Sequence, residues 1–230
     1  MFLKIETKDK NENNRNYIYK TLRYNIMHLY IKPGELISET ELCKYFNVSR
    51  TPIREAFIKL SEEKLIDIYP QRGSYVSRID LKIVKEGIFM RKSLEKSILF
   101  ESTKKISNDT LKELKKILAF QKTLAELNAT SSEFFNLDNK FHETIFRECS
   151  MERIWEIIDN MNTHYNRLRF LDTTEKMNTI KIIEQHEKII EIIEKKDITQ
   201  IDSLVDQHLT NIMEKINFLA KKFPTYFTDI

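Results

Sequence analysis

Glycine and proline, the residues that most often end a helix, are concentrated at the front of this chain. Five of the seven lie within residues 1–80, and only two lie in the 150 residues that follow. The charges divide at the same point, because the whole net charge of +3 belongs to the front part and the rear part has equal numbers of basic and acidic residues. The sequence therefore predicts a mainly α protein of two parts, with a boundary near residues 78–81.

Hydropathy and cysteine content exclude several classes of protein. No stretch approaches the roughly 18 uncharged apolar residues that a membrane-spanning helix needs. Residues 1–15 mix both charges and have no apolar centre, so we expect no secretory signal, no membrane contact and a cytoplasmic location. Cys43 and Cys149 are too few and too far apart for a disulfide framework or a thiolate zinc site.

The front part begins with two predicted helices. A polar tail over residues 1–16 precedes apolar residues at helical spacing, which predict a first helix over 17–30. Ser38 and Glu41 have the spacing of a capping box, which predicts a second helix over 39–46.

A third helix and a hairpin complete this part. Ser49 is expected to cap a helix that runs to about residue 64, with Pro52 in its first turn. Apolar residues flank the segment 69–73, which predicts two strands joined by a tight basic turn. This order of elements is typical of a winged helix-turn-helix domain, here over residues 17–78.

The third helix and the hairpin carry the candidate DNA-binding residues. The helix leaves Arg50, Thr51 and Arg54 exposed near its N-terminus, the end that a recognition helix presents to bases. Arg72 and Gly73 lie in the basic turn. Each arginine alone is equally consistent with ordinary solvated surface, but the combination predicts binding to double-stranded DNA.

The stretch Val48-Ser-Arg-Thr-Pro-Ile-Arg-Glu-Ala56 closely resembles the signature of the GntR family of bacterial transcription regulators. The resemblance covers residues 17–78 and implies a module that binds a short palindromic operator as a dimer. Thr40 departs from the pattern, because many relatives have an arginine there, and this puts one groove contact in doubt.

The resemblance implies a role for each candidate. Arg50 and Arg54 would read bases or adjacent phosphates, and Thr51 would contact the DNA backbone. The turn formed by Arg72 and Gly73 would be the wing and would approach the minor groove.

The rear part, residues 81–222, is predicted to be an all-α antiparallel bundle of about six helices, with a short tail over 223–230. Short polar connections favour antiparallel neighbours. The expected helices cover residues 81–105, 108–127, 132–149, 151–171, 178–195 and 198–222.

Four polar residues interrupt the apolar stripes of these helices. Asp138 and His142 are four residues apart and therefore share one inward face. His186 lies 11 residues before the expected turn at Asp197 and His208 lies 11 after it, so a rise of about 1.5 Å per residue places the two imidazoles level. One carboxylate and three neutral imidazoles can surround a divalent metal ion, with zinc expected first and nickel or manganese as alternatives. The other interpretation is that each histidine is a core residue with a polar partner.

Arg91 lies on the buried face of the first rear helix, with Glu95 one turn later. The simpler interpretation is an internal ion pair between the two. The functional interpretation is a guanidinium that binds a carboxylate effector while the metal holds the other end of that effector. His164 lies at the edge of an apolar stripe, where we expect packing rather than support of the site.

The motifs Asp138-x-x-Phe-His142, Glu184-Gln-His186 and Asp206-Gln-His208-Leu209 resemble the FCD effector domain of the FadR-type subfamily within the GntR family. In metal-binding members the aspartate and the three histidines are ligands, and an arginine at the position of Arg91 is associated with small organic acids. The resemblance implies a homodimeric regulator, most commonly a repressor, that responds to a small carboxylate. The turn Lys195-Lys-Asp197 lacks the glycine that is usual in relatives.

Two other functions use the same residues. A winged-helix regulator with a purely structural metal would keep the ligands and bind no effector. A metal-dependent hydrolase would need a general base, but Glu143 and Glu187 adjoin predicted ligands and point about 100° away from them on a helix. We therefore expect no enzyme.

Overall fold

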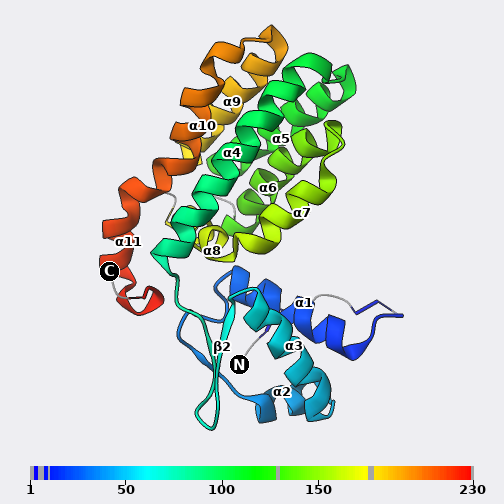
Figure 1. The fold of residues 1–230 in the computed structure, drawn as a ribbon, viewed down its shortest axis with the longest axis vertical. Coiled ribbons are helices and arrows are strands. Elements are labelled where there is room, and N and C mark those ends of the chain that lie inside the picture. The colour runs from blue at the N-terminus through cyan, green and yellow to red at the C-terminus, as the bar shows by residue number, and fades with distance from the viewer. Residues whose placement is uncertain (1–2, 5–7, 10, 128–129, 176–178, 229–230) are drawn as a thin grey trace. The chain divides into compact units, whose positions relative to one another are not determined.

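The computed structural model describes residues 3–4, 8–9, 11–127, 130–175 and 179–228. The chain divides into two compact units, one formed by Met1–Leu81 with Ala220–Ile230 and the other by Lys82–Leu219. Helices make up most of both units, and a small sheet lies in the first (Figure 1). None of the described helices combines the length and the apolar composition that a membrane-spanning segment needs.

The first unit has a winged helix-turn-helix fold, as predicted. Its elements are α1 (Asn14–Met27), β1 (Leu36–Ile37), α2 (Glu39–Phe46), α3 (Arg50–Glu62), β2 (Ile66–Tyr69) and β3 (Gly73–Val76). β3 is the central strand and pairs antiparallel with both β2 and β1, and β1 is a strand that the sequence did not predict. The Ser38 hydroxyl accepts a hydrogen bond from the Glu41 amide at 3.2 Å, so the predicted cap of α2 is present.

Two details of this unit differ from expectation. α1 starts three residues early, because the Asn13 side chain caps it by accepting from the Asn16 amide at 2.8 Å, and it ends before residue 30, because Leu29 has a left-handed φ of 56°. Ser49 precedes α3 but makes no capping hydrogen bond through its side chain. The reason is Pro52, which occupies the third helical position and has no amide hydrogen to donate.

The second unit is a helical bundle, as predicted. Its elements are α4 (Leu81–Lys105), α5 (Asn108–Glu126), α6 (Ser131–Glu148), α7 (Glu152–Met161), α8 (Thr163–Thr174), α9 (Thr179–Lys195), the 3₁₀ turn η1 (Ile198–Gln200), α10 (Ile201–Thr210) and the 3₁₀ turn η2 (Asn211–Lys215). The chain then continues through α11 (Ile216–Lys222) and a last 3₁₀ turn, η3 (Pro224–Tyr226). α5 packs against both α6 and α9, and α6 packs against α8.

The helix expected over residues 151–171 is two helices, α7 and α8. Asn162, with φ −92° and ψ 28°, leaves the helical conformation between them. Its amide donates to the Ile158 carbonyl at 3.0 Å, and its carbonyl accepts from the Asn166 amide at 2.7 Å. Asn162 therefore ends one helix and starts the next, a position that suits asparagine better than a helix interior does.

The helix expected over residues 198–222 begins with the 3₁₀ turn η1 and is interrupted once, by η2. At this interruption the Asn211 side chain is buried and donates to Gln185 Oε1 at 3.1 Å. An asparagine held by a side-chain bond of this kind is a poor interior residue for an α-helix, which accounts for the tighter 3₁₀ turn.

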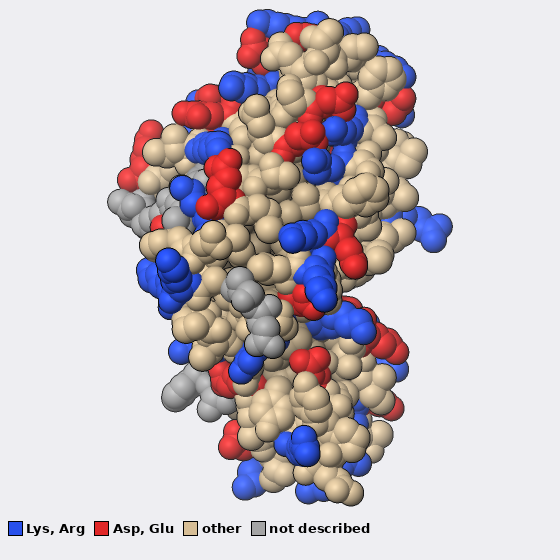
Figure 2. Space-filling view, turned by 60° about the vertical axis from the view of Figure 1, so that its left-hand side comes forward, with Lys and Arg blue, Asp and Glu red and all other residues tan. Residues whose placement is uncertain are grey.

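Charges of both signs are interspersed over the face drawn in Figure 2, without a large region of one sign. Several charged side chains of the second unit pair between helices, as Lys96 does with Asp206 and Lys115 with Glu194. Exposed pairs of this kind contribute little to stability. The residues that distinguish the second unit are instead the polar groups in its interior.

Candidate functional sites

The candidate DNA-binding residues of α3 are exposed. Arg50, Thr51 and Arg54 lie in its first two turns. Arg54 Nε donates to both carboxylate oxygens of Glu39, at 3.0 and 3.3 Å, and thereby joins α3 to the first turn of α2. This acidic partner was not predicted, and it fixes the direction in which the guanidinium points.

The hairpin turn between β2 and β3 depends on two residues in the left-handed region, Gln71 with φ 63° and Gly73 with φ 107°. A Cβ atom on Gly73 would also lie 2.9 Å from Cδ1 of Leu36, which is too close. The positive φ is the main reason for glycine at this position, because the exposed Leu36 side chain can rotate away from a Cβ. Arg72 is exposed beside it, where the sequence predicts a wing.

Three of the four predicted metal ligands meet in the interior of the second unit. His142 in α6, His186 in α9 and His208 in α10 each offer one ring nitrogen, and these three atoms lie within 4.8 Å of one another. Nε2 of His142 is 3.1 Å from Nε2 of His208. Two nitrogen ligands of one zinc ion, each about 2.1 Å from it, lie about 3.4 Å apart, so the spacing is that of a metal site.

A side-chain oxygen lies within reach of the other ring nitrogen of each histidine. His186 Nδ1 donates to Gln121 Oε1 at 2.8 Å, and His208 Nδ1 donates to Gln185 Oε1 at 3.0 Å. His142 Nδ1 lies 3.3 Å from Oε2 of Glu95. Nδ1 of each ring carries the proton in this arrangement, so the Nε2 lone pairs face one another. His186 Nε2 is buried and has no hydrogen-bond partner among the described residues. Facing lone pairs repel unless a cation lies between them, so the donor set fits a divalent metal.

Burial keeps the three imidazoles neutral. It lowers the pKa of His142, His186 and His208 well below the usual value of 6.5, and the neighbouring positive groups lower it further. Neutral imidazole is the form that binds a metal ion.

Asp138, the fourth predicted ligand, lies beside this group but outside the set of three. Its Oδ1 is 3.4 Å from His186 Nε2, and its Oδ2 forms an ion pair with Arg169 Nη2. The carboxylate thus faces the imidazoles with one oxygen and a guanidinium with the other. His164 is buried in α8 and does not belong to the cluster found among the described residues.

Arg91 forms the internal ion pair with Glu95 that the simpler interpretation predicts. Arg91 Nη2 lies 2.5 Å from Glu95 Oε1, and the arginine is 1% exposed. Burial is the largest effect and opposes the charged form, but Glu95, Tyr165 and Asp159 together outweigh it and raise the pKa of Arg91, so the guanidinium stays ionised. Through its two oxygens, Glu95 joins Arg91 to the imidazole of His142.

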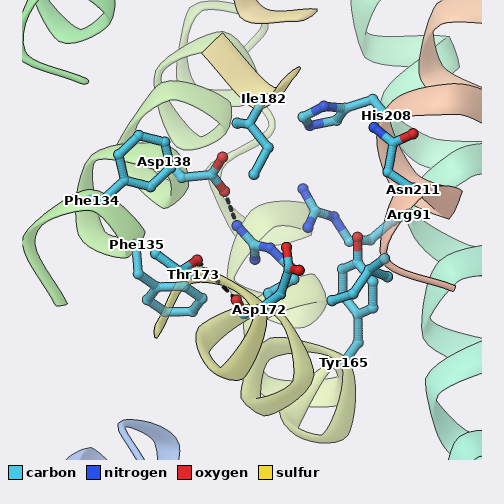
Figure 3. Close-up of a pocket in the computed structure, with 12 residues that line it drawn as sticks. Arg91, Phe134, Phe135, Asp138, Tyr165, Asp172, Thr173, Ile182, His208 and Asn211 are labelled. Carbon is cyan, nitrogen blue, oxygen red and sulfur yellow. Dashed lines mark hydrogen bonds and ion pairs between the residues drawn. The ribbon is translucent and has the colours of Figure 1, made fainter. Parts of the chain in front are cut away.

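A small pocket opens next to the histidines, with about 30 Å³ of space available to the centres of water-sized molecules. Figure 3 shows Arg91, Asp138 and His208 pointing into this space. The lining residues are Arg91, Phe134, Phe135, Asp138, Tyr165, Arg169, Asp172, Thr173, Ile182, His208, Asn211 and Ile212. Two guanidiniums, two carboxylates, aromatic faces and an imidazole of the cluster therefore share one cavity, which is the composition of a site for a small polar ligand.

Three residues of this site were not predicted: Gln121, Gln185 and Arg169. Gln121 could have been found, because it lies three residues after Leu118 on a buried stripe of α5 and is itself fully buried. Gln185 adjoins His186 in sequence and would be expected to point elsewhere on the helix. No sequence pattern marks Arg169 as part of the site.

Comparisons with known proteins support the same division of the chain. Residues 14–76 match the family model described as bacterial regulatory proteins, gntR family, and residues 86–211 match the FCD domain. The chain is 32% identical over 212 residues to the HTH-type transcriptional repressor RspR of Escherichia coli K12, covering 92% of each protein. It is 30% identical to the gluconate operon transcriptional repressor of Bacillus subtilis, covering 86% of this chain and 83% of the relative.

Solved structures share the fold. Escherichia coli McbR/YncC has a TM-score of 0.71 at 17% identity, with 92% of this chain and 99% of that chain covered. A transcriptional regulator GntR from Rhodococcus sp. RHA1 has a TM-score of 0.73 at 17% identity, with coverages of 89% and 97%. The matching families and relatives are transcription regulators and not enzymes. The chain therefore belongs to the GntR family of bacterial transcription regulators and combines a DNA-binding helix-turn-helix domain with an FCD domain.

Proposed function

We propose that this protein is a homodimeric repressor that binds a divalent metal and a small organic acid in its FCD domain, and that this ligand changes its affinity for a palindromic operator. The observation that carries the proposal is the convergence of three imidazoles, two of them buried and one half-buried, each with a side-chain oxygen beside its Nδ1. Partners of this kind fix the tautomer and the ring orientation of metal-binding histidines.

His142, His186 and His208 would hold the ion through Nε2, and Asp138 would add Oδ1. Zinc fits these nitrogen and oxygen donors, as do nickel and manganese. Ions that accept five or six ligands keep positions for an effector oxygen beyond these four, and the metal would supply Lewis acidity toward that oxygen.

The pocket favours an anion as effector. Arg91 and Arg169 both line it, and burial together with the nearby Arg91 charge lowers the pKa of Arg169. Each guanidinium already has a carboxylate partner, Glu95 for Arg91 and Asp138 for Arg169, and an anionic effector would share these cations with those partners. A carboxylate matches the planar guanidinium of Arg91 and can bind it through two hydrogen bonds.

Repression follows if effector and operator prefer different conformations of the dimer. Arg50, Thr51 and Arg54 would contact one DNA half-site, and Arg72 with Gly73 would reach the adjacent groove. A coupling of about 1–3 kcal/mol between the sites changes operator affinity about 5- to 150-fold. Two relatives are named repressors, which favours repression as the role of DNA binding here.

Metal analysis and titration test the proposal. The protein is purified without chelators, its metal content is measured by mass spectrometry, and EDTA-treated protein is titrated with zinc, nickel and manganese. His186→Ala should bind none of the three tightly, whereas His28→Ala, at the C-cap of α1, should bind as the wild type does. Failure of all three ions to bind the wild type contradicts the proposal.

Effector binding is tested by titrating metal-loaded protein with acetate, lactate, malate and citrate. Binding of any of these acids that is lost in Arg91→Gln supports a sensor. The second candidate is a regulator with a purely structural metal, which the deep burial of His142 and His186 favours. It predicts metal binding without any response to the four acids. Native mass spectrometry with a palindrome selected from random DNA tests the dimer in the same preparation.

A further inference from the structure

The C-terminal residues of the chain return to the DNA-binding unit. The chain passes between the two compact units twice, once after Leu81 and again after Leu219. The second passage lies within α11, at the end of the bundle. We call residues 224–228, which follow α11, the C-terminal strap.

The strap is bound to the segment that follows the wing. Ile79 donates its amide to the Tyr226 carbonyl at 2.7 Å, and the Thr228 amide donates to the Ile79 carbonyl at 3.1 Å, which forms a parallel bridge. Phe227 is 2% exposed and Ile79 is fully buried. Two backbone hydrogen bonds and a buried aromatic side chain make this a specific attachment and not a loose end of the chain.

The strap also approaches the turn before β1. Gly34 has a left-handed φ of 82°, and a Cβ there would lie 3.5 Å from the Thr225 carbonyl oxygen. The Gly34 amide in turn donates to the Val76 carbonyl at 2.8 Å, at the end of the wing strand β3. The strap therefore contacts parts of the unit that hold the wing in place.

The other end of this connection lies at the histidine cluster. Gln185 Oε1 accepts from two donors, His208 Nδ1 at 3.0 Å and Asn211 Nδ2 at 3.1 Å. His208 is a member of the cluster, and Asn211 is the first residue of η2. One oxygen thus links the orientation of the imidazole to the start of the 3₁₀ turn.

The geometry points to a transmission element: we propose that the segment from His208 to Phe227 carries the metal and effector state of the FCD domain to the winged helix. This inference rests on the proposed function. A 3₁₀ stretch inside a longer helix often marks a hinge, and its hydrogen bonds are weaker than those of an α-helix.

The movement available to this segment is large enough to act on the strap. Conversion of the five residues of η2 between 3₁₀ and α geometry changes the axial length by about 2.5 Å and turns the following helix by about 100°. Ile79 and Phe227 are in contact through a backbone bridge, so the strap must then either shift the segment after β3 or detach from it.

The test uses a pair of variants at one position. Thr228→Pro removes the amide that donates to Ile79, and Phe227, with φ −107° and ψ 151°, already has the extended conformation that a residue before proline requires. Thr228→Ala keeps the amide and is the matched control. Zinc is the probe, and its dissociation constant and the operator dissociation constants with and without zinc are measured for each protein.

We expect zinc to change operator affinity at least fivefold in the wild type and in Thr228→Ala, and less than twofold in Thr228→Pro, with the zinc dissociation constant equal in all three. A full zinc effect in Thr228→Pro overturns the strap proposal and leaves the proposed function standing. Zinc binding with no effect on operator affinity in the wild type also overturns it. A wild type that binds no zinc, nickel or manganese instead contradicts the proposed function.

Hydrogen exchange in the wild type gives a second readout that does not depend on a variant. Zinc should change the exchange rates of the Ile79 and Thr228 amides several-fold, because both amides belong to the bridge. Unchanged rates at both amides in zinc-saturated protein contradict transmission through the strap.

Discussion

Arg169 forms an ion pair with Asp138 at the wall of the pocket, and the other oxygen of this carboxylate lies 3.4 Å from His186 Nε2. Arg169 therefore orients a residue that is proposed to bind the metal. It is itself held in place by a hydrogen bond of 2.9 Å to Asn166 Oδ1 and by the ring of Phe135, whose centre is 5.0 Å away.

Arg169→Gln should consequently weaken zinc binding about 10- to 100-fold, the usual effect of losing a residue that orients a ligand. The measurement is competition for zinc with a chelator of known affinity. Arg147→Gln, which removes an exposed arginine paired with Glu113, is the control and should leave zinc affinity unchanged. Equal zinc affinities for both variants would show that Asp138 is not a ligand or does not need this partner.

Gln121 should matter in the same way, although it lies outside the pocket. Gln121→Leu removes the acceptor for His186 Nδ1, so the imidazole is no longer held in the tautomer that presents its Nε2 lone pair. We expect zinc affinity to fall about 10- to 100-fold. Gln121→Glu keeps an acceptor and should bind zinc more tightly than Gln121→Leu does. The reverse order in the chelator competition would contradict this role.

The histidine cluster was predictable from the sequence because α6, α9 and α10 each bury one stripe. A polar residue on such a stripe is conspicuous, and the hairpin of α9 and α10 sets His186 and His208 level. Arg169 was not predictable, because ten of the 12 residues of α8 are buried and the helix has no single apolar face against which a polar residue stands out.

The winged helix was predictable from its caps and turns, whereas the attachment of the C-terminus was not. The strap depends on backbone hydrogen bonds of Ile79 and on one buried aromatic residue, Phe227, and neither produces a periodic pattern. The helix breaks at Asn162 and Asn211 were not predicted for a related reason. Each break depends on a single asparagine, and its hydrogen bonds form only where tertiary packing places a partner.

Metal-free protein should lose stability as the pH falls below about 6.5. Burial lowers the pKa of His142, His186 and His208 in the folded protein, whereas the unfolded chain titrates near the usual value of 6.5. The unfolded state therefore binds more protons in acid. Stability is full above that value and declines as the pH falls toward the folded pKa values, by up to about 1.4 kcal/mol per pH unit for each histidine.

Urea unfolding of EDTA-treated protein at several pH values between 5 and 7.5 measures this slope. His186→Leu, which removes one of the three titrating groups, should show a shallower slope than the wild type. Identical slopes would mean that the His186 imidazole is not held neutral in the folded state.

Arg54→Ala should weaken operator binding by about 1–3 kcal/mol, the usual cost of losing an arginine that reads bases. Its ion pair with Glu39 predicts a second effect. Glu39→Gln should reduce discrimination between the operator and mismatched DNA, because the guanidinium is no longer directed. Fluorescence anisotropy with matched and mismatched duplexes measures both. Arg153→Ala, in α7, is the control for loss of one positive charge, and an equal loss of affinity in that variant would remove Arg54 from base recognition.

Gly87 allows α4 to approach the break between α7 and α8. A Cβ on Gly87 would lie 2.2 Å from Oδ1 of Asn162, and both residues are buried. Gly87→Ala should therefore destabilise the protein, because overpacking costs about 1–3 kcal/mol and the better helix propensity of alanine offsets only about 1 kcal/mol of that.

Removal of the opposing side chain should relieve the clash at no cost in hydrogen bonds, since neither Oδ1 nor Nδ2 of Asn162 has a hydrogen-bond partner among the described residues. We expect Gly87→Ala/Asn162→Ala to be more stable than the sum of the two single variants predicts, and urea unfolding of all four proteins gives this coupling. Additive effects would mean that α4 can move away from the break without cost, and that the close approach of the helices does not depend on glycine.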